Sequence, residues 1–405
     1  MSLTTFNTTH IDIGLAPLSV IGEMASLIRT PVENVTVLHV INGEHFSGAE
    51  RVQQLLGKRL EEFGFDARFA CVKPNRFPEL CGLSNEQVVE TAMRSRFDLS
   101  VISKLTNYVH EHSVALLHAH TPRTAMITSL VAMRTGLPWV YHVHSPTSRD
   151  GTRGTVNRVN SWIERYSILN CDCLITVSAS LAKEMLRLGV AEHRLVTVPN
   201  GVPAIKPIDA RARLDERHWR LGIVALMRPR KGVEVALYAM QRLKNAGRSV
   251  TLELIGGFES TDYQRQIMAM VEELNVQDIV KWTGFTSDVP EAIRTLDGLV
   301  LPSLFGEGMP MVVLEALSAA VPVVATSVEG TPEVVRDGVE GMLAEPRSVK
   351  SLVSKIEELI SDRRRWFAMS GCALARHRAY YSDARMAQGV AAAYDRVLAV
   401  RKCQA

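Results

Sequence analysis

"SLFGEGMPMVVLEALSAAVPVVAT" occupies positions 303–326 and decides how the second half of the chain folds. Proline suits the first position of a helix and cannot continue one, so Pro310 and Pro322 predict a helix that begins at Pro310 and ends before Pro322. Nearly every side chain from Met309 to Val321 is apolar, and a helix that is apolar all round is normally buried. Its single carboxylate, Glu315, therefore needs a partner, because glutamate is almost never fully buried without one.

Strand and helix patterns alternate on both sides of this helix. "GLVLPS" precedes it and "PVVAT" follows it, and "RLGIVALM", "VTLELIGG" and "IVKWTG" are earlier strand patterns separated by helical spacing. In the first half, six strand patterns alternate with helical ones: "VTVLHV", "DARFACV", "VALLHAH", "PWVYHVHS", "CLITVS" and "LVTVPNG". Short apolar strands separated by helices build parallel sheets. We predict an α/β protein with two consecutive Rossmann-like, doubly wound domains.

The boundary between the two domains is predicted near residues 200–218. "NGVPAIKPIDARARLDERHW" is rich in Pro, Asp and Arg and interrupts the periodicity. We therefore expect an N-terminal domain at 1–205, with 1–34 as an extension or irregular arm, and a second domain at 206–380. The last helical segment, 381–405, is expected to cross back to the N-terminal domain.

Composition excludes several classes of function. The 405 residues are 46% hydrophobic and 22% charged, with a formal net charge of +3, so the charge gives no reason to expect nucleic acid as a partner. Cys171 and Cys173 fit a buried reduced pair better than a zinc site, because no second cluster or nearby His accompanies them. No apolar run approaches 18 residues and no signal-peptide pattern opens the chain, so we expect a cytoplasmic setting.

The loop "PSLFGEGMP" lies where ligands bind in parallel sheets, beyond the carboxyl end of a strand and before a helix. Gly306 and Gly308 allow backbone amides to approach an anion at the start of that helix. Glu307 lies in the loop, and Glu315 follows eight positions later within the helix. One site facing the other domain could receive both carboxylates.

Two further turns are predicted to point toward the same edge. "ALMRPRKGVE" places Arg228, Arg230 and Lys231 between a strand and a helix, where they would repel one another unless an anion lies nearby. "NGEHFSGAERVQ" places Ser47 and Gly48 directly before a helix. Each cationic turn alone is explained as well by a solvated loop. Together the turns predict a phosphate-bearing ligand between the domains, with its sugar hydroxyls bound by a carboxylate.

Four histidines stand on two predicted strands. His118 and His120 alternate with apolar residues, which favours a structural role on the core side of the strand. His142 and His144 share a face, and the strand-end position of His144 favours a place in the site.

The same stretches occur, in the same order, in one known family. "EGMPMVVLEALSAAVPVVATSVEGTPEVVRDGVEGML" resembles the E-x7-E region of GT-B glycosyltransferases, specifically retaining family four, the glycosyl transferases group 1. "FSGAERVQQLL" resembles the G-G-A-E-R loop of that family, "LLHAHTPRTAM" its H-x-H strand, "WVYHVHS" its T-x-H-G strand end, "LMRPRKG" its R-x-x-P-x-K-G turn and "WTGF" its base-side loop. This agreement extends over most of the chain and is far more specific than one E-x7-E.

The resemblance implies a GT-B fold and transfer of a hexosyl group, with retention, from a nucleotide-diphosphate sugar of UDP or GDP to a hydroxyl of a saccharide, lipid carrier or small molecule. It implies that Glu315 binds the ribose hydroxyls and that Glu307 lies near the donor sugar and its leaving oxygen. The segment after Glu307 would contact sugar hydroxyls or phosphate; its members are Gly308, Met309, Pro310 and Met311.

By the same resemblance, Lys231 neutralises the diphosphate, and the loop with Ser47 and Gly48 touches the diphosphate or the sugar. His144 borders the reacting sugar. Phe285 is expected near the base.

The chain departs from the family pattern at two positions. Leu226 aligns with the motif arginine and cannot bind phosphate, so Arg228, two positions later on the same side of an extended segment, is the expected replacement. Ser47 replaces the first glycine of the N-terminal loop.

No metal or cofactor is predicted beyond the donor substrate. No D-x-D stands at a strand end, and cations with helix-start amides can stabilise a diphosphate leaving group without one. A nucleotide-sugar epimerase or a phosphorylase on the same fold remains an alternative, and so does a non-catalytic two-domain protein that closes around a sugar. "RDGTRGTVNRVNSWIER" would suit an anionic lipid carrier or peripheral association with the inner face of a membrane, or is a plain solvated loop.

Overall fold

The computed structural model describes residues 34–95, 98–145, 165, 168, 170–207 and 217–404. Val35–Ala405 form one compact unit. The predicted extension at 1–34, except for residue 34, and almost all of the basic stretch at 149–165 lie outside the described residues. Among the helices of the described part, none combines the length and the apolar character that crossing a bilayer requires.

The first sheet has seven parallel strands in the order β3-β2-β1-β4-β5-β6-β7. The strands are β1 Val35–Ile41, β2 Phe65–Cys71, β3 Val88–Glu90, β4 Leu116–Ala119, β5 Trp139–Val143, β6 Cys173–Thr176 and β7 Leu195–Thr197. All six predicted strands are present. The structure adds β3, a short edge strand on which no residue is fully buried.

The second sheet has six parallel strands in the order β10-β9-β8-β11-β12-β13. The strands are β8 Trp219–Val224, β9 Val250–Ile255, β10 Val280–Gly284, β11 Gly298–Leu301, β12 Val323–Thr326 and β13 Gly341–Ala344. In both sheets the chain winds outward, returns and winds outward on the other side. The order reverses between β1 and β4 and between β8 and β11, and these are the positions where ligands bind in such folds.

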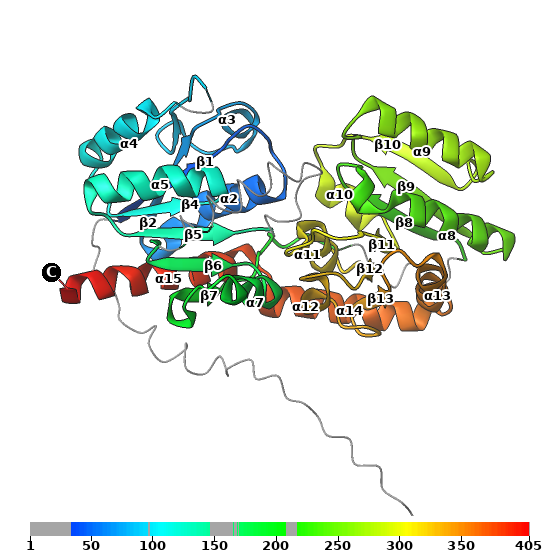
Figure 1. Ribbon diagram of the computed structural model, residues 1–405. Coiled ribbons are helices and arrows are strands. Elements are labelled where there is room, and N and C mark those ends of the chain that lie inside the picture. The colour runs from blue at the N-terminus through cyan, green and yellow to red at the C-terminus, as the bar shows by residue number, and fades with distance from the viewer. Residues whose placement is uncertain are drawn as a thin grey trace, which may run out of the picture. The chain divides into compact units, whose positions relative to one another are not determined.

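Helices cover the first sheet in two layers (Figure 1). Helices α4 and α5 pack together, as do α2 and α15, and α5 contacts β4 while α15 contacts β6. The helices of this half are α2 Gly48–Arg59, α3 Arg76–Leu80, α4 Ser100–Glu111, α5 Pro122–Thr135 and α7 Ala179–Arg187, with short 3-10 turns at Leu60–Phe63 and Glu192–Arg194.

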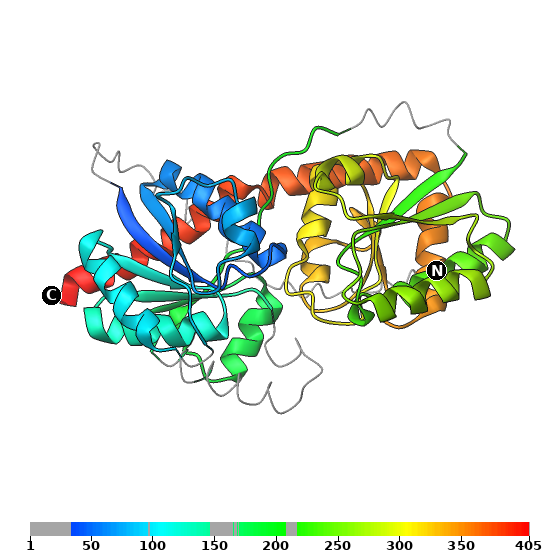
Figure 2. The same cartoon turned by 90° about the horizontal axis from the view of Figure 1, so that it is seen from above.

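The helices of the second half end in two long ones that run consecutively (Figure 2). They are α8 Val233–Asn245, α9 Thr261–Glu273, α10 Val289–Arg294, α11 Met311–Ser318, α12 Thr331–Val334, α13 Val349–Ile360, α14 Arg363–Tyr380 and α15 Asp383–Gln404, with a 3-10 turn at Pro229–Lys231. Helix α14 packs on α11 of the second half, whereas α15 packs on α2 of the first. The tail therefore contacts both halves.

Helix α11 begins one residue later than predicted and ends at Ser318, before Pro322. Pro310 is its N-cap, with ψ of 112°, and the first helical residue is Met311. The prediction of Pro310 at the first helical position was wrong because its ψ is extended rather than helical. The rest of the prediction is confirmed: the helix is buried on nearly all sides, and Glu315 is only 2% exposed.

Candidate active site

The predicted site residues follow the strands at which each sheet reverses its order. Ser47 and Gly48 start α2 after β1, Arg228 and Lys231 follow β8, and the Glu307 loop follows β11. Because the strands are parallel, these turns all lie at the carboxyl edge of their sheets. Ser47 caps α2 reciprocally with Glu50, which fixes the loop at the start of that helix.

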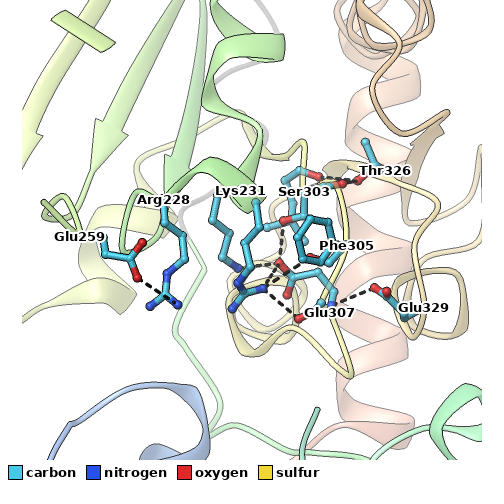
Figure 3. Close-up of polar contacts among 11 residues, drawn as sticks. Arg228, Lys231, Glu259, Ser303, Phe305, Glu307, Thr326 and Glu329 are labelled. Carbon is cyan, nitrogen blue, oxygen red and sulfur yellow. Dashed lines mark hydrogen bonds and ion pairs between the residues drawn. The ribbon is translucent and has the colours of Figure 1, made fainter. Parts of the chain in front are cut away.

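Glu307 is a buried carboxylate held by several donors in the second half (Figure 3). Its Oε1 accepts hydrogen bonds from Lys231 Nζ at 2.5 Å and from Ser303 Oγ at 2.6 Å, and Arg230 Nη1 lies 4.0 Å away. Its backbone N–H donates to Glu329 at 3.0 Å. The carboxylate and its cation are thus fixed in one geometry before any ligand binds.

The cationic turn has its anions within the protein. Lys231 pairs with Glu307, and Arg228 pairs with Glu259 (Figure 3). Nη1 of Arg228 lies 3.6 Å from Oε1 of Glu259. Arg230 instead donates to the carbonyl of Gly306 at 3.0 Å. The like charges therefore do not depend on a bound anion. Glu259 is half exposed, so Arg228 can exchange this partner for a ligand more easily than Lys231 can.

The loop of residues 306–311 contacts the first half of the chain directly. A Cβ on Gly308 would lie 2.2 Å from the carbonyl oxygen of His144, so only glycine allows this approach. A Cβ on Gly48 would lie 3.5 Å from Cγ of Met311. Asn200 Nδ2 donates to the carbonyl of Met309 at 3.3 Å. The structure thus brings Gly48, His144 and this loop together, as the site prediction requires.

Glu315 lies 264 positions after its protein partner. Arg51 Nη1 approaches Oε1 of Glu315 to 2.5 Å, from the first turns of α2. Arg51 was not among the predicted site residues, although it is the arginine of the "GAER" motif and lacks an obvious partner in its own helix. The Arg51 guanidinium therefore compensates the negative charge of Glu315, the single carboxylate of the apolar helix.

The contact leaves Glu315 incompletely satisfied. Among the described residues, its Oε1 has no aligned hydrogen-bond donor, even though Arg51 is close. Burial raises the pKa of Glu315, and the Arg51 guanidinium opposes that shift. A buried carboxylate oxygen without a hydrogen bond is costly, so this atom favours a hydroxyl donor from a ligand.

A pocket of about 300 Å³ reaches this pair. Its walls come from Arg51, the segment after β7, α10 and Glu315; the lining residues are Arg51, Val202, Pro203, Ala204, Ile205, Lys206, Asp288, Pro290, Glu291, Arg294 and Glu315. Residues from both halves therefore enclose it. Glu307 and Lys231 lie outside its lining, so the two carboxylates occupy neighbouring parts of the site rather than one wall.

Phe285, predicted near the base, and Leu226, at the position of the motif arginine, are both exposed, and neither lines the pocket. Phe285 follows β10 and is 79% exposed, and it does not line the pocket. Leu226 is 47% exposed, so an arginine at that position would also reach solvent. The assignment of Phe285 to a nucleotide base stays a prediction.

A carboxylate that accepts hydrogen bonds from backbone N–H groups connects the halves at the start of α7. The first two residues of that helix, Ala179 and Ser180, donate backbone N–H groups to the two oxygens of Glu333 at 2.7 and 2.8 Å. A carboxylate at a helix start is favoured by the helix dipole. This contact was not predicted, because the two partners lie more than 150 positions apart in the sequence.

Five histidines gather in the core of the first half, next to the site. His118 and His120 are buried, which confirms their predicted position on the core side, and His142 stacks on His144 with ring centroids 4.4 Å apart. His39, on β1, completes the cluster. Two sets of three have nitrogens within 4.8 Å of one another and could hold a metal ion: His39, His118 and His120, and His120, His142 and His144.

The fold resembles several solved structures. Anabaena HepE in complex with UDP and glucose has a TM-score of 0.78 and 20% identity, over 89% of this chain and 100% of that one. Sucrose-phosphate synthase from Thermosynechococcus elongatus has a TM-score of 0.76 and 19% identity, over 91% of this chain and 100% of that one. The fold is GT-B, with two Rossmann-like domains that both contribute to the site.

The family follows from sequence comparison. The model described as Glycosyltransferase Family 4 matches residues 46–204, and that described as Glycosyl transferases group 1 matches residues 205–371. The chain belongs to this family of glycosyltransferases, as its motifs predicted.

Two characterised relatives show the range of that family. A UDP-Gal:alpha-D-GlcNAc-diphosphoundecaprenol alpha-1,3-galactosyltransferase from Escherichia coli is 24% identical over 359 residues, 83% of this chain and 90% of the relative. A GDP-mannose-dependent alpha-(1-6)-phosphatidylinositol monomannoside mannosyltransferase from Mycolicibacterium smegmatis is 28% identical over 294 residues, 67% of this chain and 73% of the relative.

Proposed function

We propose that this protein is a retaining, metal-independent hexosyltransferase that moves a sugar from a UDP- or GDP-linked donor to a hydroxyl acceptor. The observation that carries the proposal is Glu315, a buried carboxylate with an unsatisfied oxygen in a pocket between the halves. The ribose of a nucleotide offers two adjacent hydroxyls, which can donate to one carboxylate. Relatives that use UDP-Gal and GDP-mannose support a donor of this class.

The donor diphosphate is expected beside the cationic turn. Cleavage at the anomeric carbon develops negative charge on the leaving phosphate, and fixed cations stabilise that charge without reorganising. Lys231 is held within 2.5 Å of Glu307 and is mostly buried, which makes it the preorganised cation. Arg228 supplies the second charge after leaving the half-exposed Glu259. This arrangement supports a mechanism in which protein cations, rather than a metal ion, stabilise the negative charge on the leaving diphosphate.

Retention is proposed through same-face attack rather than double displacement, because both carboxylates are already engaged. Glu307 already accepts from Lys231 and Ser303, and Glu315 faces Arg51, so neither is presented as a nucleophile. In same-face attack the acceptor oxygen bonds to the anomeric carbon as the bond to phosphate breaks. The acceptor proton passes to the leaving phosphate oxygen, so no enzyme base is needed.

The acceptor is proposed to be a saccharide or a lipid-linked saccharide. The named relatives act on a diphosphoundecaprenol-linked sugar and on a phosphatidylinositol mannoside. The proposal includes peripheral association with the inner face of a membrane, where such acceptors lie. A flotation assay with anionic vesicles tests that part independently, and recovery only in the unbound fraction would contradict it.

The experiment that tests the function is a donor panel. UDP- and GDP-sugars are incubated with the purified protein, first without acceptor and with EDTA, and free nucleotide diphosphate is measured. Slow hydrolysis of one donor, accelerated by an acceptor, supports the proposal. Formation of a new nucleotide sugar would indicate an epimerase, and dependence on inorganic phosphate a phosphorylase. Binding without any turnover would indicate a sugar-binding protein, and an α-to-β change in the product would exclude retention.

A further inference from the structure

The start of helix α7 is capped partly by the other half of the chain. The first N–H groups of a helix have no partner within that helix. In α7, Ser178 Oγ accepts a hydrogen bond from the N–H of Leu181 at 3.3 Å, within the same half. The two preceding N–H groups, those of Ala179 and Ser180, donate to Oε2 and Oε1 of Glu333 instead. One carboxylate of the second half therefore completes the cap of a helix in the first half.

Glu333 is fixed on its own side by the end of α14. Its carbonyl oxygen accepts hydrogen bonds from the Tyr381 hydroxyl at 2.9 Å and from Arg376 Nη2 at 2.8 Å. Arg376 Nε donates to the next carbonyl, that of Val334, at 2.7 Å. Because the backbone of α12 is held in this way, the reach of the half-buried Glu333 side chain determines where α7 can lie against α12.

The segment of residues 329–333 also packs on the Glu307 loop. The N–H of Gly330 donates to the carbonyl of Glu307 at 2.9 Å, and the N–H of Glu307 donates to Oε2 of Glu329 at 3.0 Å. A Cβ on Gly330 would overlap the carbonyl of Gly308, so no space separates the two segments. The residue that reaches α7 and the loop that carries Glu307 therefore form one packed unit of the second half.

Helix α7 borders the same loop from the other half. A Cβ on Gly308 would lie 3.1 Å from Cδ1 of Leu181 and would overlap the carbonyl of His144. Leu181 directly follows the two residues whose N–H groups bind Glu333. The strands that precede His144 and α7, β5 and β6, are paired neighbours in the first sheet. A separation of α7 from α12 would therefore also open the close approach between Gly308 and His144.

We propose that Glu333 is a positioning residue: its carboxylate holds α7 against the Glu307 loop and thereby keeps His144 beside the donor sugar. Its partners are backbone N–H groups that lie outside the proposed donor contacts, whereas ribose binding would replace Arg51 at Glu315. The Glu333 contact should therefore persist when the donor binds and the Arg51 contact is exchanged. The kinetic part of this inference rests on the proposed function, whereas the contact with the N–H groups does not.

Hydrogen–deuterium exchange of the full chain, resolved to single amides, tests the contact without turnover. Glu333→Ala should raise the exchange rates of Ala179 and Ser180 about 10- to 100-fold, because two charge-assisted hydrogen bonds are lost, and leave those of β9 unchanged. In wild type, saturating UDP or GDP should leave both amides protected. Unchanged exchange in Glu333→Ala would refute the contact, and deprotection by the bound nucleotide in wild type would refute its persistence.

Transfer kinetics test the positioning role. In Glu333→Ala, kcat should fall about tenfold, because a displaced group beside the reacting atoms slows the chemical step. The dissociation constant for UDP or GDP should stay nearly unchanged, because Lys231, Glu307 and Glu315 all lie in the second half. An equal loss in nucleotide affinity, or an unchanged or higher kcat, would overturn the proposal.

Two conservative variants separate the reach of the side chain from its charge. Glu333→Gln keeps the length and one acceptor oxygen, so it should retain more activity and more amide protection than Glu333→Ala. Glu333→Asp keeps the charge but ends one methylene earlier, so it should behave like the alanine variant. Attraction to the dipole of α7 alone would place Asp above Gln, and that order would overturn the positioning role.

Asp362→Ala is the matched control. Asp362 accepts a hydrogen bond from the N–H of Arg364 at 2.9 Å at the start of α14, so it is also a carboxylate on a helix start, but both partners lie in the second half. Its loss should lower the free energy of unfolding and leave kcat unchanged. A similar fall in kcat would mean that lost stability, not the lost contact between the halves, slows transfer. Absence of nucleotide binding and turnover would refute the proposed function, while amide exchange in Glu333→Ala would still decide the contact.

Discussion

Arg51 Nη1 lies 2.5 Å from Oε1 of Glu315, so a cation from α2 of the first half compensates the single carboxylate of the apolar helix α11 in the second. The arginine is 28% exposed on its side chain and the glutamate 3%. Only one partner is therefore desolvated. A ligand that donates to the glutamate can displace the arginine into water at little cost, which makes the ion pair a replaceable contact rather than a fixed one.

Glu315→Gln separates the contribution of the carboxylate to donor binding from its effect on the free energy of unfolding. Hydrogen bonds to a charged group contribute about 1.5 to 3 kcal/mol, so kcat/KM for the donor should fall about 10- to 100-fold. The free energy of unfolding should not fall, because the substitution removes a desolvated charge. Steady-state kinetics and urea denaturation measure the two effects.

Glu291→Gln is the matched control for this substitution. Glu291 lines the same pocket but its side chain is half exposed and pairs with Arg294 at the surface. We expect near-normal kinetics for it. Normal kcat/KM in Glu315→Gln, or an equal loss in Glu291→Gln, would contradict the ribose assignment.

Arg51→Gln should change how stability depends on pH. Burial raises the pKa of Glu315 above its ordinary value of 4.5, so the folded state holds this proton more tightly than the unfolded state does. The contribution of Glu315 to the free energy of unfolding therefore becomes less favourable as the pH rises from 4.5 through the pKa of the folded state. Removing Arg51 removes the opposing cation, raises that pKa further and extends the loss to higher pH.

The measurement is the free energy of unfolding of wild type and Arg51→Gln between pH 4 and 8. The difference should grow with pH in that window and disappear in the Glu315→Gln background, because the titrating group is then absent. A pH-independent difference would show that Arg51 acts through packing instead.

The fold was largely predictable because strands of parallel sheets are buried on both faces and read as continuous apolar runs. The strand that escaped prediction in the first sheet, β3, lacks this burial. In the site, residues at strand ends could be predicted from turns such as the one that holds Arg228 and Lys231. The ion-pair partner of each charged residue could not be predicted. Lys231, for example, pairs with Glu307, 76 positions away, through loop conformations that no local pattern encodes.

The same reasoning explains why the hydrogen bonds among the histidines of the first half were not predicted. Alternation on a strand placed His118 and His120 on the core side, but the hydroxyl that connects His118 to the other rings belongs to Tyr394, 276 positions later. From the sequence, an apolar position in the last helix, such as that of Tyr394, predicts only a packing role. Only the three-dimensional arrangement shows that it also has hydrogen-bond partners.

Lys231→Met should abolish most of the transfer. Removing a preorganised cation next to a developing phosphate charge typically costs about 100-fold or more in kcat. Stability should also fall, since the buried Glu307 loses its closest cation while keeping its charge. Lys231→Met/Glu307→Gln should recover the stability but not the activity. Recovery of kcat in the double variant would mean that Lys231 only neutralises Glu307.

Arg228→Met tests whether this arginine replaces the one that family members carry at the position of Leu226. We expect about a tenfold loss in kcat/KM for the donor, smaller than that for Lys231→Met, because Arg228 is paired with a half-exposed glutamate and is less fixed. Leu226→Arg added to Arg228→Met should restore part of that loss, since Leu226 is exposed enough to admit an arginine. No effect of Arg228→Met on kinetics would refute the replacement.

Gly308→Ala tests the close approach between the two halves. The added Cβ would lie 2.2 Å from the carbonyl oxygen of His144, and a backbone atom cannot move aside as a flexible side chain can. We therefore expect the loop of residues 306–311 to separate from His144, with a large loss of transfer and a lower free energy of unfolding.

Gly371→Ala is the control of opposite sign. Gly371 lies within α14, and its new Cβ would meet no neighbouring atom within 4 Å, so alanine in this helix interior should stabilise the fold by about 0.5 to 1 kcal/mol. Thermal and chemical denaturation measure the stability of the two variants, and donor hydrolysis measures their activity. Wild-type activity in Gly308→Ala would mean that the contact between His144 and this loop is not part of the working site.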